Sequence, residues 1–211
     1  MGRFTAEHLF QAGGLGMILS AVLADTYLTI AGGASGDHGS GDELRLLLVG
    51  NFAPMGIAFV TWGFGRRHGR MFLEGRRGVA LLLAFVLMLF DGVIHLFAFN
   101  AHVLVPLHAA FFLGVGFVQI VGAFTLPRAS GRALLGWSLL TVLLLGFYAL
   151  SRVSSLLGGL EEVEGLGLLS KAVEAVLLGS ILYRRRSITP ASPGEAPREP
   201  AGARGAARSP R

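Results

Sequence analysis

Long apolar runs separated by short polar stretches dominate the chain from about residue 8 to residue 183. A helix that crosses a bilayer needs about 20 mostly apolar residues, and each run has roughly that length. The pattern therefore predicts an all-α, polytopic integral membrane protein, a bundle of six transmembrane helices formed as three consecutive hairpins. We expect these helices at about 8–30, 44–64, 79–99, 103–126, 133–153 and 163–183.

The composition leaves no room for a separate soluble domain. Of the 211 residues, 53% are hydrophobic and 15% are charged, whereas soluble domains usually carry about 25% charged residues. Residues 187–211 are rich in Pro, Ala, Gly and Arg, which cannot form a packed core. The chain is therefore predicted to divide into a six-span transmembrane domain, 1–186, and a disordered cytoplasmic tail, 187–211.

The loops between the apolar runs alternate in charge. Arginines occupy 65–78, 127–132 and the end of the last run, whereas 33–43 and 154–164 are acidic. Because basic loops stay in the cytoplasm, the sequence predicts a multi-pass protein of the cell membrane with both termini in the cytoplasm. Alternatively, the first apolar run is a cleaved signal peptide, since small residues at 31–35 offer a cleavage site. Cleavage would leave five spans in the same orientation.

The charge balance and the cysteine count narrow the function further. The net charge is +5, and in a membrane protein we assign this excess to topology and lipid headgroups, not to nucleic acid. The chain has no cysteine, which excludes disulfides, Cys-ligated zinc, iron–sulfur clusters and thiol nucleophiles. The expected partners are the lipid bilayer and either a larger membrane complex or further copies of this chain.

Several ionisable side chains fall inside the predicted spans. Each such group costs roughly 2.5–3.5 kcal/mol on insertion scales, so each needs a partner, water or a function. In the predicted topology these groups gather in the outer half of the bilayer, which favours an outward-facing polar cavity. The group comprises Asp25, Asp91, His95, His108, Lys171 and Glu174.

His95 and His108 flank the predicted turn between the third and fourth spans. At 1.5 Å per residue, both lie about 9–10 Å from that turn and therefore at the same depth on neighbouring helices. Asp91 lies one helical turn from His95, where a carboxylate can orient an imidazole or bind a metal itself. The pattern favours a transition-metal site or a b-type haem held by His95 and His108. Asp91 would be the third group, and Glu174 or Asp25 the fourth.

Two other functions use the same residues. A proton-coupled transporter would use Asp91, Lys171 and Glu174 as a proton relay or gate. An accessory subunit of a larger complex would have no chemistry of its own, and the polar groups would join helices. The sequence has no P-loop and no Gly-x-Ser-x-Gly motif, so no catalytic residue is assigned and a non-enzymatic function is favoured.

One stretch resembles a pattern in small, uncharacterised multi-span proteins of bacteria and archaea. The sequence Ile94-His95-Leu96 stands near the end of one span, and His108 follows after a short turn. An apolar helix then ends in Gly116-Phe117-Val118-Gln119. The resemblance covers about 30 residues and implies that His95, His108 and Gln119 act as one unit. It implies no particular activity or ligand.

Overall fold

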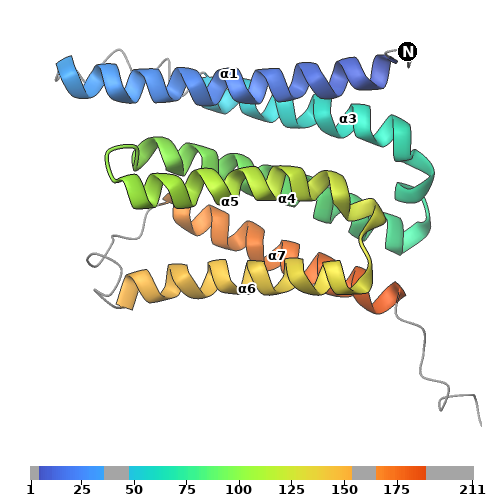
Figure 1. The fold of residues 1–211 in the computed structure, drawn as a ribbon. Helices are drawn as coiled ribbons and strands as arrows, with labels where there is room; N and C mark the ends of the chain where they lie inside the picture. Colours follow the sequence, from blue (N-terminus) through green and yellow to red (C-terminus); the bar gives the residue numbers. More distant parts are fainter. Residues whose placement is uncertain (1–4, 36–47, 154–164, 189–211) are drawn as a thin grey trace, which may run out of the picture.

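The computed structural model describes residues 5–35, 48–153 and 165–188, and these residues form helices without strands (Figure 1). Six of the helices in these residues are longer than 18 residues. They run side by side and form an elongated bundle. In chain order the elements are α1 (Ala6–Ser35), the π-helix η1 (Leu48–Phe52), α3 (Ala53–Phe72), α4 (Gly75–Ala101), α5 (Pro106–Thr125), the 3₁₀-helix η2 (Leu126–Arg128), α6 (Gly131–Val153) and α7 (Gly165–Ile188).

The helices pack as three hairpins, and α4 lies at their centre. Each hairpin pairs two helices that follow one another in the chain: α1 with α3, α4 with α5, and α6 with α7. The central helix α4 also contacts α1, α3 and α7. Any side chain on α4 can therefore meet partners from most of the bundle, and both buried polar clusters described below include residues of α4.

Four of the helices are long and apolar enough to cross a membrane. They are Ala6–Ala31, Gly75–Ala101, Pro106–Arg128 and Gly131–Val153. α3 and α7 do not meet the same test among the described residues. α3 ends with three arginines and a histidine, and α7 carries Lys171, Glu174 and a closing run of arginines. The structure thus confirms that the described residues are all-helical and include four helices long and apolar enough to span a membrane, but it does not confirm six spans.

The second helix is displaced toward the C-terminus relative to the prediction. We expected a helix over 44–64 followed by a basic loop over 65–78, but α3 continues to Phe72. Arg66, Arg67 and Arg70 therefore stand on the last turns of a helix and not in a loop. The π-helix η1 precedes α3 directly. Pro54 lies in the first turn of α3, where its missing N–H is tolerated.

The other helix ends are closer to the prediction. α6 begins two residues before the expected position and ends at the expected Val153. α7 continues to Ile188, so the first two residues of the predicted tail are helical. Residues 189–211, and most of the two acidic loops, lie outside the described residues.

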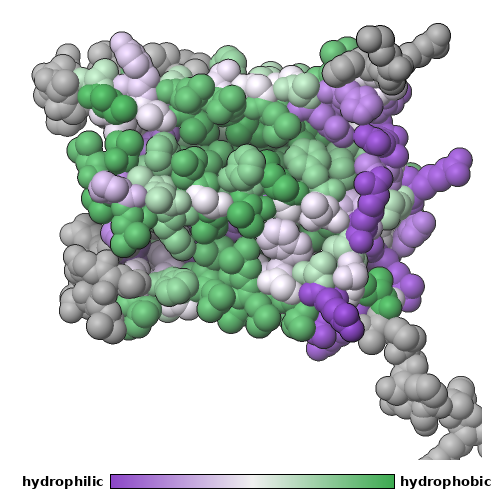
Figure 2. All heavy atoms as spheres, in the orientation of Figure 1, coloured by the Kyte–Doolittle hydropathy of each residue, from purple (hydrophilic) through white to green (hydrophobic). Residues whose placement is uncertain are grey.

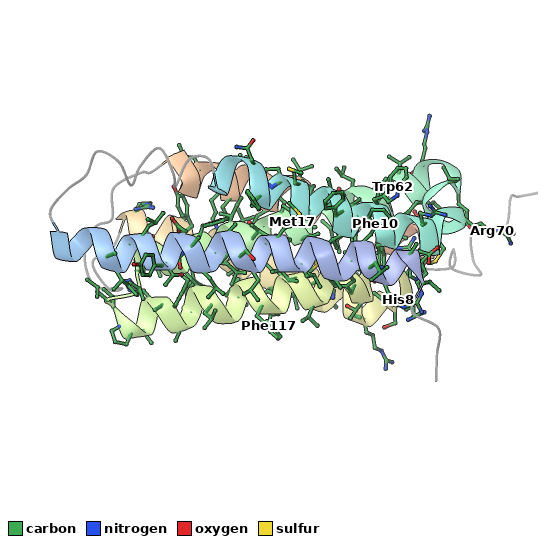
Figure 3. The ribbon with its side chains drawn as sticks, turned by 90° about the horizontal axis from the view of Figure 1, so that it is seen from above. His8, Phe10, Met17, Trp62, Arg70 and Phe117 are labelled. Atoms are coloured by element: carbon green, nitrogen blue, oxygen red, sulfur yellow. The ribbon has the colours of Figure 1, made fainter. Side chains whose placement is uncertain are left out.

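Charged side chains gather at one end of the bundle, as the hydrophilic atoms in Figure 2 show. This end holds the C-termini of α3 and α7 and the N-termini of α1, α4 and α6 (Figure 1). Among the described arginines, Arg152 alone belongs to the opposite end, near the C-terminus of α6. The remainder of the visible surface is mainly apolar, and Trp62 and Phe117 are 60% and 64% exposed (Figures 2 and 3). Such a surface suits contact with lipid tails.

Glycines allow two helix pairs to approach closely. A Cβ atom added to Gly92 of α4 would lie 2.9 Å from the carbonyl oxygen of Gly116 in α5, and one added to Gly116 would lie 2.8 Å from that of Gly92. Gly14 and Gly56 form the equivalent contact between α1 and α3, at 2.5–2.6 Å. Small residues at such crossings are typical of membrane helix pairs. The contact between Gly92 and Gly116 brings α5 directly against the part of α4 that carries Asp91.

Candidate functional site

Three ionisable side chains meet in the interior between α4 and α7. Asp91 and Glu174 have no exposed surface, and His95 is 4% exposed. Asp91 and His95 share one face of α4 because they are four residues apart, and α7 packs against α4. One ligand atom from each residue lies within 4.8 Å of the others. We call these residues, with Lys171, the central cluster.

Both carboxylate oxygens of Asp91 accept hydrogen bonds from other helices. Gln119 of α5 donates through Nε2 to Oδ2 at 2.5 Å. Ser170 of α7 donates through Oγ to Oδ1 at 2.9 Å. Asp91 thus joins α4 to two neighbours, and its hydrogen-bond acceptors are satisfied in spite of complete burial.

His95 is held in one tautomer by its own helix. Its Nδ1 lies 2.9 Å from the backbone carbonyl oxygen of Asp91. Since a carbonyl can only accept, Nδ1 carries the proton and donates it, and the neutral ring presents Nε2 as an acceptor. Nε2 faces Glu174, whose Oε1 is 3.8 Å away. His95 can therefore take a proton or a metal ion at Nε2 from the direction of α7.

Glu174 has one carboxylate oxygen in contact with two donors and one that is available. Lys171 donates through Nζ to Oε1, and Ser170 Oγ lies 3.4 Å from the same oxygen. Oε2 is buried and has no hydrogen-bond partner among the described residues. An unsatisfied buried carboxylate oxygen is unfavourable. Protonation of Oε2, or a cation bound to it, would satisfy this atom.

Lys171 connects the central cluster to the C-terminal part of α6. Its side chain is 16% exposed, and Nζ lies 5.4 Å from the centroid of the Tyr148 ring. The guanidinium of Arg152 lies over the same ring, at 4.6 Å. Tyr148 therefore has two cations near its ring, and its electron-rich face stabilises both.

The four ionisable side chains do not cancel in charge when all are in their common states. Two carboxylates, one ammonium and a neutral imidazole give a net charge of −1. The addition of one proton makes the cluster neutral. A net charge is costly in a low-dielectric interior, and either one proton or one bound cation would offset it.

The donor set also fits a divalent transition metal. Imidazole nitrogen and carboxylate oxygen are common zinc ligands, and two ligands of a tetrahedral zinc ion lie roughly 3.4 Å apart. The 3.8 Å between His95 Nε2 and Glu174 Oε1 is close to that value. An ion at this point would compete with the ammonium group of Lys171, which already binds the same oxygen of Glu174.

Among the described residues, His108 is not part of the group of close ligand atoms that Asp91, His95 and Glu174 form. The ring of His108 lies 5.6 Å from that of His102, which in turn packs 4.8 Å from Phe112. We placed the two histidines level because we expected the turn near residue 101. The turn instead covers 102–105, and α5 begins at Pro106. His108 is therefore only two residues inside its helix, whereas His95 lies six residues, or about 9 Å, from the end of α4.

Asp25 also lies apart from the central cluster. Its Oδ2 accepts a hydrogen bond of 2.6 Å from Asn100 Nδ2, and the same amide donates to the carbonyl oxygen of Val22 at 3.1 Å. Thr26 Oγ1 donates to Asn100 Oδ1 at 2.5 Å. Asp25, Thr26 and Asn100 form a second buried cluster, between α1 and α4, which we call the Asp25 cluster.

Sequence reasoning missed Ser170 and Asn100. Both are neutral polar residues, and the hydrophobic pattern does not predict that they contact a buried carboxylate. Ser170 lies four residues before Glu174, on the same helical face, and that spacing was the available signal. The resemblance predicted a role for Gln119, and the structure places it against Asp91.

Comparison with protein-family models, curated proteins and solved structures finds no match for this chain.

Proposed function

We propose that the protein is an integral membrane protein in which the central cluster binds and releases a proton, and that this proton controls how α7 packs against α4. A protein that moves a small solute together with protons works in this way. The observation that carries the proposal is the composition of the cluster. Two carboxylates share one ammonium group and one imidazole with a free acceptor nitrogen, and one added proton makes the group neutral.

The proposed topology has six spans with both termini in the cytoplasm. Its support is the gathering of arginines at one end of the bundle, because basic residues mark the cytoplasmic side. In this orientation Asp91, His95 and Glu174 lie in the outer half of the bundle. α3 and α7 would cross within the bundle, where their charged side chains meet other helices.

Proton binding and helix packing are linked through Glu174. In the described arrangement Lys171 binds the carboxylate of Glu174, and Ser170 contacts both carboxylates of the cluster. A proton on Glu174 would remove the charge that holds Lys171. Ser170, one residue before Lys171, would then keep its contact with Asp91 alone. A proton between Glu174 and His95 Nε2, whose atoms lie 3.8 Å apart, would add a hydrogen bond from α7 to α4 beside that of Ser170 and so change how the two helices pack.

Infrared difference spectroscopy between two pH values tests proton binding directly. The purified protein in lipid should show a carboxylic-acid C=O band that grows as the pH falls. Glu174→Gln should remove this band, and Asp91→Asn should shift it. Glu7→Gln, at a partly exposed carboxylate outside the cluster, is the matched control and should leave the band unchanged. A band that persists in both cluster variants would overturn the proposal.

Reconstitution then tests the coupling to transport. Liposomes that contain the protein should lose a pH gradient faster in the presence of the transported solute, and Glu174→Gln should abolish the difference. A screen of small solutes by this dye-based measurement does not need the substrate to be known beforehand. Proton binding without solute-dependent flux would favour an accessory role in a larger complex.

The second candidate function is a transition-metal site at the same residues. The observation that favours it is the close approach of three ligand atoms from Asp91, His95 and Glu174. A stoichiometric metal in the purified protein, lost in His95→Ala, would support this function over the first. We do not carry forward a haem held by His95 and His108, because the ring of His108 packs beside His102 instead.

A further inference from the structure

At the arginine-rich end of the bundle, far from the central cluster, α1, α3 and η2 enclose a polar pocket of about 190 Å³. Its polar lining comes from Gln11 of α1, Arg67 and His68 of α3, and Arg128 of η2. The aromatic rings of Phe64 and Phe124 form its apolar wall, and these rings pack edge to face at 5.6 Å. The pocket therefore has a rigid apolar base and a basic rim.

The charge of this pocket is one-sided. None of the described residues that line it is acidic. Arg184 lies at its edge, where its guanidinium donates to the carbonyl oxygen of Pro127 at 3.5 Å, and Glu74 is the acidic group that interacts with Arg184. The carboxylate of Glu7 lies near Arg66 instead, at 4.0 Å. Arginines brought together in this way repel one another, and an anion between them would relieve the repulsion.

The donors of the pocket are also oriented. His68 Nδ1 donates to the backbone carbonyl oxygen of Phe64 at 3.2 Å, and the imidazole stacks on the Phe64 ring at 4.3 Å. Arg67 is steadied by His8, whose Nε2 lies 3.3 Å from one guanidinium nitrogen. Figure 3 shows His8 at the same end of the molecule as Arg70. These contacts hold two basic side chains in place before any ligand arrives.

We propose that this pocket binds an anionic phosphate group, with Arg67 and Arg128 as its principal donors and Gln11 as a further donor. Guanidinium groups bind phosphate oxygens through paired, charge-assisted hydrogen bonds. The pocket is lined by residues of the last turns of α3 and of η2, and Figure 2 shows that the hydrophilic end of the bundle borders the apolar surface. That is the level of lipid headgroups, so the phosphate comes from an anionic lipid or from a soluble phosphate ester at the membrane surface.

Lipid retention tests the proposal. The protein is placed in nanodiscs of phosphatidylcholine with a minor fraction of phosphatidic acid, released in neutral detergent and weighed by native mass spectrometry. We expect phosphatidic acid to be retained about tenfold over its share of the bilayer, because each charge-assisted hydrogen bond changes affinity about tenfold. Arg67→Gln with Arg128→Gln should reduce retention to that share.

Arg132→Gln is the matched control. Arg132 stands one turn away, at the start of α6, and is exposed; it does not line the pocket. This variant should retain phosphatidic acid like the wild type. An equal loss in Arg132→Gln would show general surface charge and overturn the proposal. Circular dichroism confirms that each variant is folded.

A ligand-stabilisation experiment on the wild type separates the two sources of phosphate and does not depend on any variant. Glycerol phosphate is added to the protein in nanodiscs of pure phosphatidylcholine, and the thermal midpoint is measured. A rise in the midpoint shows a soluble ester as ligand. An unchanged midpoint, with phosphatidic acid still enriched, shows a lipid. No enrichment and no rise together overturn the proposal.

Discussion

The two buried clusters lie on opposite faces of α4 and stabilise their buried carboxylates in different ways. Asp91 and Asn100 are nine residues apart, which is about two and a half helical turns, so one faces α7 and the other faces α1. In the Asp25 cluster a single carboxylate receives a hydrogen bond from a neutral amide, and the amide is itself held by a hydroxyl group. In the central cluster two carboxylates, a lysine and a histidine share one site.

The difference shows which cluster is suited to join helices and which is suited to change state. The amide of Asn100 has both its donor and its acceptor atoms engaged, so the Asp25 cluster has one stable arrangement. The central cluster has an open oxygen on Glu174 and an acceptor nitrogen on His95. It can take another cation without breaking the contacts of Asp91. A buried charge is therefore not by itself a sign of function. A buried charge with unused hydrogen-bond acceptors beside it is a better sign.

Removal of the lysine should have the largest effect on the central cluster. Lys171→Met leaves two buried carboxylates without their cation, and the loss of one partner of a buried pair costs about 3–5 kcal/mol. Thermal unfolding in lipid measures the loss. The double variant Lys171→Met with Glu174→Gln should recover most of the stability. If it recovers none, the ammonium group does not compensate Glu174.

A smaller loss is expected when the amide of the Asp25 cluster is removed. Asn100→Leu leaves the carboxylate of Asp25 without this donor, which costs about 1–3 kcal/mol. Asp25→Leu with Asn100→Leu should be more stable than Asn100→Leu alone, as measured by the same unfolding experiment. The infrared band assigned to Glu174 should persist in both variants. Its loss would show that the two clusters titrate together, contrary to their placement on opposite faces.

The contact between α7 and α4 should contribute about 1 kcal/mol through Ser170. Ser170→Ala removes the donor to Asp91, and hydrogen bonds between membrane helices are worth about 0.6–2 kcal/mol. Ser180→Ala is the matched control, because Ser180 is also buried in α7 but donates only to Val176 of its own helix. Equal losses in both variants would mean that the link to Asp91 adds no stability.

The smallest effect should come from His108. His108→Gln should change stability by less than about 0.5 kcal/mol and should leave the infrared band unchanged, since His108 contacts His102 and not the central cluster. His95→Gln should alter the band, because it removes the acceptor that faces Glu174. A large effect of His108→Gln on the band would restore the pairing of the two histidines that the sequence predicted.

The sequence was sufficient for contacts within a helix but not for those between helices. The spacing of Asp91 and His95 predicted a contact along one helix, and the structure has it. Lys171 and Glu174, three residues apart on α7, form a contact of the same kind. The partners of Asp91 on α5 and α7 depend on how each helix is rotated about its axis, which an apolar pattern on a lipid-facing helix leaves undefined. Asp25 shows the same limit, since its depth alone suggested the wrong neighbour.

The error at His108 has a more local cause. A pair of residues can be placed level across a hairpin only when the length of the turn is known, and each additional residue shifts the register by about 1.5 Å. Pro106 was the available sign of where α5 begins, because proline suits the first turn of a helix. With that start point, the sequence places His108 near the helix end, as in the structure.

The close contact between Gly92 and Gly116 has a consequence for biogenesis. Chains are synthesised from the N-terminus, and neighbouring segments fold first. α4 and α5 are joined by four residues, so they can leave the insertion machinery as a finished hairpin while α7 is still inside the ribosome. In the proposed topology, Asp91 would have Gln119 as its interhelical hydrogen-bond partner at that stage. Gln119 would thus be the hydrogen-bond donor to Asp91 during insertion, before Ser170 of α7 is in place. Replacement of Gln119 should therefore reduce the yield of inserted protein more than the stability of the folded protein.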